Sequence, residues 1–313
     1  MSGTVIKRTT LICRDATRMM RFYRDVLGWR VDYDSKLTLS GGIIPCAKPG
    51  EQVQLYIMAG QDPEIGKVGL LEWVAPRLPD PGPPTHRLGI GDVVLVADVP
   101  NMIDLVKRIE SFDGAKIHSA PADGTFPDPR GQGTIEYTSM SFFDPEGFFY
   151  ETYFRYNRPN PEKFLIRRTT CIVRDVDRAV GFLSALGLNK YQDSTMQIEG
   201  ILAAGKAGDT VRFAVCRAQH DYIGMAAALA FLKDPLPDPG EATFNYGIGR
   251  AMFVAGTDDA AALVERVISA AGRVTRAPFE RTVPKTGGNG QTRMISMGFH
   301  DPDGMLWEVN QRL

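Results

Sequence analysis

Apolar residues recur along the chain with the periods of strands and helices. A short apolar run from Val5 to Cys13 is typical of a buried strand. The segment that follows repeats its apolar residues at helical spacing, between Asp15, a good N-cap residue, and Gly28, which suits a left-handed helix end. The predicted apolar stripe of this helix consists of Met19, Phe22, Tyr23, Val26 and Leu27. The pattern therefore predicts a strand followed by an amphipathic helix.

Further strands and a second helix complete the first half of the chain. A helix is predicted from about Pro100 to Phe112. Asp144-Pro145-Glu146-Gly147 has the proline and glycine positions of a type I turn between two strands. The other predicted strands are Trp29 to Tyr33, Val53 to Met58, Val68 to Val74, Val93 to Ala97, Thr138 to Phe143 and Phe148 to Phe154. The order is β-α-β-β-β, twice.

The second half of the chain repeats the first. Arg8-Thr9-Thr10-Leu11-Ile12-Cys13-Arg14-Asp15 returns as Arg168-Thr169-Thr170-Cys171-Ile172-Val173-Arg174-Asp175. The Leu-Pro-Asp-Pro-Gly run at 78–82 returns at 236–240, and Gly-Ile-Gly at 89–91 returns at 247–249. Collinear matches at this long period indicate two whole domains. We predict domains at 1–155 and 164–313, joined by a polar, proline-containing linker at 156–163.

Composition excludes several partners. The 313 residues are 43% hydrophobic and 23% charged, with a net charge of −1 and no basic run, which gives no support for a nucleic-acid partner. No apolar run approaches the roughly 18 residues that a membrane span requires. The four cysteines show no C-x-x-C pairing, and the N-terminus has no secretory pattern. We expect a cytoplasmic protein with a small-molecule ligand, as a monomer or homodimer.

Several of these segments, taken together, resemble the vicinal oxygen chelate superfamily, which includes glyoxalase I, extradiol dioxygenases and bleomycin-resistance proteins. The matching pieces are Arg14-Asp15, Phe22-Tyr23, Val26-Leu27-Gly28, the run 91–98 and the run 144–151. The resemblance implies an α+β fold in which paired βαβββ modules form cupped, barrel-like mixed sheets. It covers all of the chain except the linker, because the second half repeats the pieces.

The resemblance also implies where a metal site would lie. Metal-using members place ligands on the first, fourth, fifth and eighth strands, commonly His or Gln, Glu, His and Glu. Placed on that pattern, the first half offers Arg8, Glu72, Asp92 and Glu151, and the second half offers Arg168, Ala230, Arg250 and Glu308. Arginine has no lone pair to donate and stays protonated, so it does not coordinate a cation. We therefore predict no metal and no cofactor. A divalent ion held by the three carboxylates of the first half is the minor alternative.

Charge favours one way of pairing the modules. If the cups form within each half, the residues of the first half sum to a charge of −2 and those of the second half to +1. If the first module pairs with the last, Arg8 and Glu72 meet Arg250 and Glu308, and their charges cancel. Because unpaired buried charge is unfavourable, we predict the crossed pairing.

Three functions fit these residues. The first is a metal-independent isomerase or lyase that acts by proton transfer on a small anionic or aromatic metabolite. Its predicted general bases are Glu72, Glu151 and Glu308. Its predicted substrate-binding residues are Arg8, Arg168, Arg250, Asp92, Tyr56 and Trp73. The second is a non-catalytic small-molecule-binding protein of the resistance type, and the weakest is an extradiol-type dioxygenase. Salt bridges that fill a vacated site are the structural alternative to all three.

Overall fold

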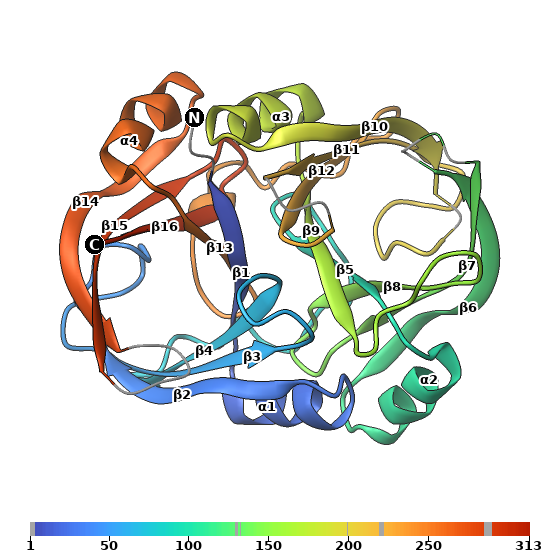
Figure 1. Ribbon diagram of the computed structural model, residues 1–313, viewed down its shortest axis with the longest axis horizontal. Coiled ribbons are helices and arrows are strands. Elements are labelled where there is room, and N and C mark those ends of the chain that lie inside the picture. The colour runs from blue at the N-terminus through green and yellow to red at the C-terminus, as the bar shows by residue number, and fades with distance from the viewer. Residues whose placement is uncertain (1–3, 129–130, 132, 199, 219–221, 285–289) are drawn as a thin grey trace.

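The computed structural model describes residues 4–128, 131, 133–198, 200–218, 222–284 and 290–313, and these form four successive βαβββ modules (Figure 1). Module 1 contains β1 (Val5–Ile12), α1 (Ala16–Asp25), β2 (Arg30–Thr38), β3 (Gln52–Ala59) and β4 (Lys67–Ala75). Module 2 contains β5 (Val93–Asp98), α2 (Met102–Ser111), β6 (Lys116–Pro127), β7 (Thr134–Phe143) and β8 (Phe149–Arg155). Module 3 contains β9 (Leu165–Ile172), α3 (Val176–Ala185), β10 (Asn189–Gln197), β11 (Thr210–Arg217) and β12 (Met225–Phe231). A 3-10 helix, η1 (Gly240–Phe244), precedes module 4, which contains β13 (Ala251–Gly256), α4 (Ala260–Ser269), β14 (Arg273–Pro284), β15 (Gln291–His300) and β16 (Leu306–Arg312).

The helix ends follow the sequence signals. The Asp15 carboxylate accepts a hydrogen bond from the Arg18 backbone N–H at 2.8 Å and so caps α1. Asp175 caps α3 in the same way. Gly28 has a φ of 73°, the left-handed region that favours glycine. The predicted caps and helix stop are therefore confirmed.

The modules pair in the crossed manner. One eight-stranded sheet has the order β14-β15-β16-β13-β1-β4-β3-β2, and the other has the order β10-β11-β12-β9-β5-β8-β7-β6. Modules 1 and 4 thus share one sheet, joined by antiparallel β1 and β13, and modules 2 and 3 share the other, joined by β5 and β9. Both sheets curl, as Figure 1 shows. We call their concave faces cup A (modules 1 and 4) and cup B (modules 2 and 3). The predicted α+β class with cupped sheets of paired modules is confirmed.

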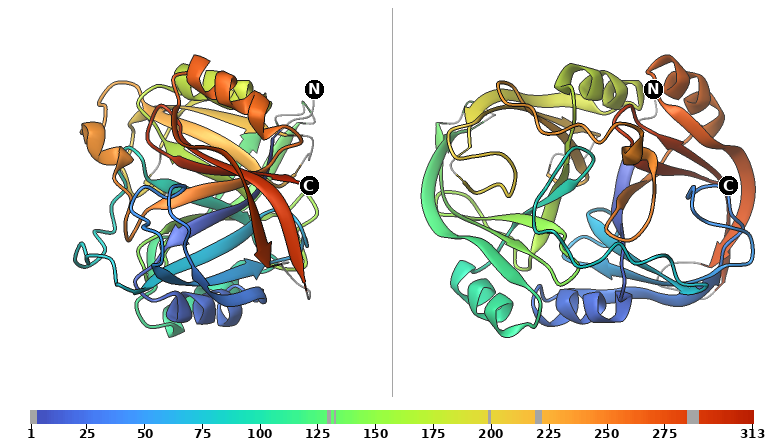
Figure 2. Two further views of the ribbon diagram at one scale, coloured as in Figure 1. Left: turned by 90° about the vertical axis from the view of Figure 1, so that its left-hand side faces the viewer. Right: turned by 180° about the vertical axis from the view of Figure 1, so that it is seen from behind.

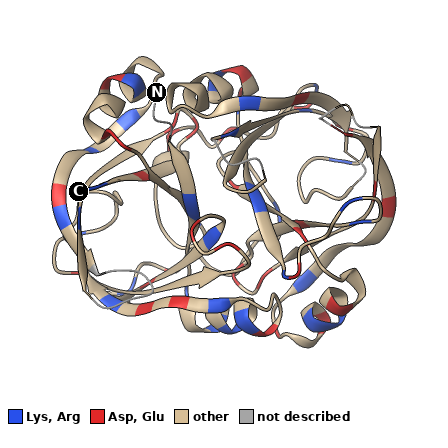
Figure 3. Ribbon diagram, in the orientation of Figure 1, with Lys and Arg blue, Asp and Glu red and all other residues tan. Residues whose placement is uncertain are grey.

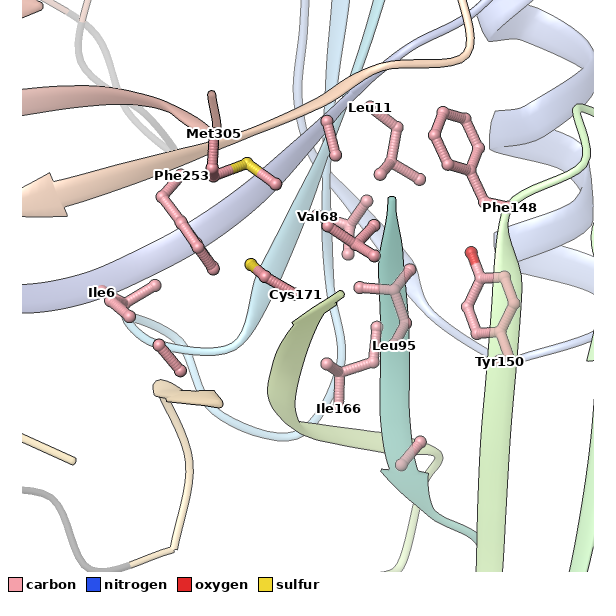
Figure 4. Packing of buried hydrophobic residues seen from close by; sticks show 14 of the residues in the cluster. Ile6, Leu11, Val68, Leu95, Phe148, Tyr150, Ile166, Cys171, Phe253 and Met305 are labelled. Atoms are coloured by element: carbon pink, nitrogen blue, oxygen red, sulfur yellow. The ribbon is translucent and has the colours of Figure 1, made fainter. Parts of the chain in front are cut away.

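The two sheets pack back to back. Their convex faces and the four helices enclose the largest apolar cluster, in which residues of β1, β5, β9 and β13 meet (Figures 2 and 4). At its centre the hydroxyls of Thr9 and Thr169, equivalent residues of the repeat, are hydrogen-bonded at 2.6 Å. Because the convex faces are buried against each other, the concave faces point away from the middle of the molecule.

A smaller apolar cluster fills part of each cup. In cup A the segment 39–51 brings Ile43 and Ile44 against residues of β3, β4 and β16. In cup B the segment 200–209 brings Leu202 and Ala203 against β7, β9 and β11. The charged residues of each cup lie on the same concave face, nearer the start of β1 or β9.

Hairpin turns link the modules within each half. Glu146, in the turn before β8, accepts hydrogen bonds from the backbone N–H groups of Arg14 and Asp15 at 3.0 and 3.1 Å. In the second half Asp303 accepts from the backbone N–H of Arg174 at 3.1 Å. The turn of the second module in each half thus binds the chain just before the helix of the module that precedes it.

Within the described part of the chain, no helix is long and apolar enough to cross a membrane. Acidic and basic residues are interspersed over both sheets and the helices (Figure 3).

Candidate functional site

The central strands align one row of side chains across each cup. In cup A the row is Lys67 on β4, Arg8 on β1, Val254 on β13 and Glu308 on β16. In cup B it is Met225 on β12, Arg168 on β9, Val96 on β5 and Glu151 on β8. Neighbouring residues in register point to the same face of a sheet. Each cup therefore holds one arginine and one glutamate at equivalent places.

A hydrogen-bonded network holds the glutamate of cup A. Arg281 on β14 donates to the Glu308 carboxylate and, through Nε, to the Ser296 hydroxyl at 2.7 Å. The Asn310 amide also donates to Glu308, at 2.9 Å. Burial alone would raise the pKa of Glu308, but Arg281 and Arg8 outweigh it and hold this pKa below its usual value. Glu308 is therefore an ion-paired carboxylate and a weak base.

Arg8 completes the charged part of cup A. Its Nε donates to the Thr10 hydroxyl at 3.1 Å, and burial, partly offset by Glu308, lowers its pKa. The guanidinium stays charged, because an arginine pKa begins above 12.

Cup B has the same two charges and different neighbours. The Tyr153 hydroxyl donates to the Glu151 carboxylate. The Arg168 guanidinium carbon lies 4.7 Å from the centre of the Phe213 ring, a cation–π distance. The Arg168 Nε is buried and has no hydrogen-bond partner among the described residues. Burial, and then the neighbouring Arg167, lower the Arg168 pKa.

A β-bulge adds a second arginine beside Arg168. Val96 pairs with Arg168 and Ala97 pairs with Ile166, so Arg167 is the extra residue of β9. The bulge breaks the alternation of side chains along the strand. Arg167 reaches Asp98, with its Nε 3.2 Å from Oδ1 of that carboxylate.

Asp98 gathers two arginines and a tyrosine. Arg155, from the end of β8, places its Nη2 3.0 Å from the same Oδ1, and the Tyr222 hydroxyl donates to the other oxygen. Asp98 is fully buried and Arg155 is 6% exposed. The Nε atoms of Arg155 and Arg167 have no hydrogen-bond partner in the described chain, although both guanidinium groups ion-pair with Asp98. The cluster thus places two positive charges against one negative charge.

Aromatic rings line the same face of cup B. The Tyr137 ring lies 5.2 Å from that of Tyr153 and 5.3 Å from that of Phe126, measured between centroids. Tyr137 lies over Gly124 on β6, where an added Cβ would come within 2.7 Å of its ring. The position of Gly124 on β6 is equivalent to that of Arg281 on β14 in cup A. One cup therefore has an aromatic wall where the other has a cation.

Two predicted site residues point away from the cups. Glu72 accepts a hydrogen bond from the Ala16 backbone N–H at 3.0 Å, and the Tyr56 hydroxyl contacts that of Thr17 at 3.3 Å. Both contacts are with the start of α1, which lies on the convex side. The predicted cup positions of Glu72 and Tyr56 are therefore wrong, because strand alternation turns Leu71 and Trp73, not Glu72, into cup A. Burial raises the Glu72 pKa.

Three other predicted residues lie apart from the two rows. Asp92 and Arg250 face each other across the seam between the sheets, with Oδ1 and Nη1 3.6 Å apart. Asp92 borders a cavity of about 180 Å³ that is also lined by Arg14 and Glu146. Trp73 is on the concave side of cup A but inside its apolar cluster, and its indole N–H donates to Glu51 at 2.9 Å. We predicted that Glu72 and Arg250 would lie in one cup with Arg8 and Glu308. This prediction is wrong for Glu72 and Arg250, which lie outside cup A.

Sequence reasoning missed several polar residues of the cups, among them Asp98, Tyr153, Arg155, Arg167 and Arg281. Alternation from Glu151 along β8 would have placed Tyr153 and Arg155 on its face. No pattern indicated the bulge at Arg167, or that the Arg281 side chain on β14 reaches Glu308 on β16.

Comparison with known proteins agrees with this geometry. The family model of the Glyoxalase/Bleomycin resistance protein/Dioxygenase superfamily matches residues 5–152 and 165–309, which lie in the two halves of the repeat. The chain belongs to this superfamily. None of the curated proteins compared with the chain matches it.

Two solved structures have a fold similar to that of this chain over nearly its whole length. Glyoxalase I from Zea mays is 19% identical, with a TM-score of 0.62, over 99% of this chain and 93% of that chain. A putative dioxygenase from Bacillus subtilis is 17% identical, with a TM-score of 0.54, over 99% of this chain and 85% of that chain. At these identities the likeness shows the fold alone.

The rows do not fit the metal that some members of the superfamily use. Each row contributes one carboxylate, accompanied by Arg8 and Lys67 in cup A and by Arg168 in cup B. A divalent cation needs several oxygen or nitrogen donors, and a guanidinium repels it. No group of three or more His, Cys, Asp or Glu residues suited to a metal gathers within the described ranges.

Proposed function

We propose that the protein binds a small organic anion in cup B without a metal ion. The observation that carries the proposal is the buried Nε of Arg168, which lacks a hydrogen-bond partner among the described residues. Arg155 and Arg167 lie on the same concave face but are ion-paired with Asp98. Buried donors are nearly always paired in proteins, so the Arg168 guanidinium favours an acceptor supplied by a ligand.

The aromatic wall narrows the kind of anion. Tyr153 lies on β8 with Glu151, and Tyr137 lies on the neighbouring strand β7. Phe213 lies on β11 and already contacts the Arg168 guanidinium. Ring faces pack against planar apolar groups, whereas a guanidinium binds a carboxylate through two parallel hydrogen bonds. An aromatic acid would use both features.

Proton transfer is the second candidate, and Glu151 favours it. Its carboxylate shares cup B with Arg168 and accepts a hydrogen bond from Tyr153, whereas Glu308 is held by Arg281. Glu151 would take a proton from a carbon atom next to the carboxylate or carbonyl of the ligand and return it at an adjacent atom, which is an isomerisation. If the returned proton instead accompanies loss of a leaving group, the reaction is that of a lyase. Arg168 would stabilise the negative charge that develops.

Matched substitutions in the two cups test the binding proposal. Arg168→Gln should weaken the binding of aromatic carboxylates by about tenfold or more, because a charged hydrogen-bond donor is lost. Arg8→Gln, the equivalent change in cup A, should leave their affinity unchanged. Affinities would be measured by calorimetry and ligand-observed NMR. Weaker binding in the Arg8 variant alone would place the ligand in cup A and contradict the proposal.

Solvent isotope exchange tests the catalytic candidate. Incubation of bound acids in deuterated water should exchange the hydrogen next to the carboxylate in the wild type and not in Glu151→Gln. If exchange persists in this variant, or is absent from both proteins for every acid that binds, the catalytic candidate is contradicted and only the binding function remains.

A further inference from the structure

The cavity of about 180 Å³ that Asp92 borders, which we call the seam cavity, has walls from three parts of the chain. They are the connection between β4 and β5, the hairpin turn before β8, and the segment 248–251 of module 4. Pro81, Pro83 and Thr85 in the first wall are exposed, so the seam cavity opens to solvent. Neither Arg168 nor Glu151, both in the described part of the chain, lines it.

The repeat has a tyrosine at the equivalent place. The runs 78–82 and 89–91 return at 236–240 and 247–249 with one constant offset, so Leu88 corresponds to Tyr246. Tyr246 is buried, and its hydroxyl accepts a hydrogen bond from the Leu306 backbone N–H. The same hydroxyl lies 3.0 Å from the carbonyl oxygen of Ala251 and 3.3 Å from that of Gly304, and it is the donor in these contacts. The second half thus encloses a phenol group of its own.

The counterparts of these three partners all line the seam cavity. They are, in the order of the chain, Val93, Gly147 and Phe149. Leu88 lines it as well. Leucine has neither the ring nor the hydroxyl of tyrosine, so the space that the Tyr246 phenol group fills in the second half stays open in the first. The seam cavity therefore has the place and the backbone surroundings of a phenol site.

The charged side chains around the seam cavity favour a neutral ligand. Arg14 is engaged by Glu146, with Nη1 and Oε2 3.2 Å apart. Asp92 faces Arg250 and accepts a hydrogen bond from the Gly89 backbone N–H at 2.8 Å. The remaining charged residue of the lining, Arg87, is exposed to solvent. An ionised ligand would compete with these existing partners, whereas a neutral hydroxyl needs only backbone groups.

We propose that the seam cavity binds a neutral phenol, whose ring and hydroxyl take the place that the Tyr246 side chain has in the second half. The volume suits one ring, since apolar cavities of about 150 Å³ bind benzene. This site is separate from the charged row of cup B, and the proposal is independent of the function proposed for that cup.

Two probes with the same ring test the ligand class in the wild-type protein. Phenol should bind with one molecule per chain in an NMR titration and should raise the temperature of unfolding, because it binds the folded state. Toluene replaces the hydroxyl with a methyl group and should bind about fivefold more weakly, since one hydrogen bond is lost. Equal or tighter binding of toluene would overturn the proposal. Failure of phenol to bind would also overturn it and would indicate a cavity that holds only water.

Substitutions taken from the repeat test the location. Leu88→Tyr supplies the missing ring and should weaken phenol binding at least tenfold, whereas Leu88→Met keeps the side-chain volume and should leave it unchanged. Unchanged phenol binding in folded Leu88→Tyr, checked by circular dichroism, would overturn the proposal.

The reciprocal variant covers the case in which Leu88→Tyr does not fold. Tyr246→Leu opens the equivalent space in the second half and should add a second phenol site. Phenol should then raise the unfolding temperature of this variant more than that of the wild type. One phenol per chain in both proteins, with equal rises in unfolding temperature, would overturn the equivalence of the two places and with it the proposal.

Discussion

The side of the sheet to which Glu72 points decides whether its role is structural or chemical. Its neighbours Leu71 and Trp73 face cup A, whereas its own carboxylate meets the first turn of α1. A carboxylate at this place satisfies a helix N–H that has no partner within the helix and lies at the positive end of the helix dipole. We therefore assign Glu72 to stability and not to the site.

Substitution of Glu72 tests this assignment. Glu72→Ala should lower the free energy of unfolding by about 1 kcal/mol, as loss of a helix-capping acceptor does. Urea denaturation would measure the change. Glu64→Ala, at a side chain that is 74% exposed, should change stability by less than about 0.5 kcal/mol. An unchanged unfolding free energy in Glu72→Ala would show that the contact with Ala16 contributes nothing.

Glu308 predicts a pH dependence of stability. Because Arg281 and Arg8 hold its folded-state pKa below the usual value of 4.5, its stabilising contribution is complete above that value and is lost as the pH falls through the folded-state pKa. Denaturation of wild type and Glu308→Gln should therefore differ by about 1–3 kcal/mol at neutral pH. The difference should shrink below about pH 4.5. A difference that is constant with pH would contradict the ion-pair interpretation.

The sequence located some cup residues because fixed signals anchor them. Arg8 and Arg168 lie seven positions before the capping Asp15 and Asp175, and Glu151 lies seven positions after the turn residue Asp144. No such signal precedes Glu72, and a register error of one residue reversed its face. Arg281 lies 27 residues before Glu308 and reaches it from β14, a contact that no local pattern could predict.

At the scale of elements, the hairpin turn before β8 does more than reverse the chain. Gly147 has a φ of 88°, and an added Cβ would come within 2.5 Å of Pro84. The turn is packed against the connection between modules 1 and 2 while Glu146 binds the start of α1. The sequence predicted the turn but not its contacts with another module.

Gly147→Ala should therefore be more harmful than an ordinary glycine substitution. Gly28 also has a positive φ, but no atom lies within 4 Å of the place that an added Cβ would take, so Gly28→Ala carries backbone strain alone. We expect a loss of about 1 kcal/mol for Gly28→Ala and about 2–4 kcal/mol for Gly147→Ala. Thermal and urea unfolding would measure both. Equal losses would indicate that the contact with Pro84 relaxes freely.

At the scale of the molecule, neither half of the repeat contains a complete sheet. Residues 1–155 include β1 and β5, whose partners β13 and β9 belong to the other half. Both strands would then present unpaired edges, which promote association. The periodicity of the sequence predicted the four modules, and the charge balance predicted their crossed pairing. Two of the residues in the charge argument, Glu72 and Arg250, nevertheless lie outside the cups.

We predict that residues 1–155 produced alone form a homodimer, in which β1 of one copy pairs with β5 of the other. Such a dimer would rebuild both sheets with the symmetry of a closed two-fold assembly. Light scattering after gel filtration would give the mass. A stable folded monomer of this half would contradict the prediction.

The pairing of modules is nested, since modules 2 and 3 are enclosed in the chain by modules 1 and 4. Val96 finds its partner Arg168 within the middle of the chain, whereas Arg8 pairs with Val254 near the other end. Long-range contacts close slowly, because more chain entropy is lost before they form. During synthesis, the first module to leave the ribosome is thus the last to be paired. Cup B can assemble while the edge of β1 is still unpaired, and that interval is when the nascent chain is most exposed to aggregation.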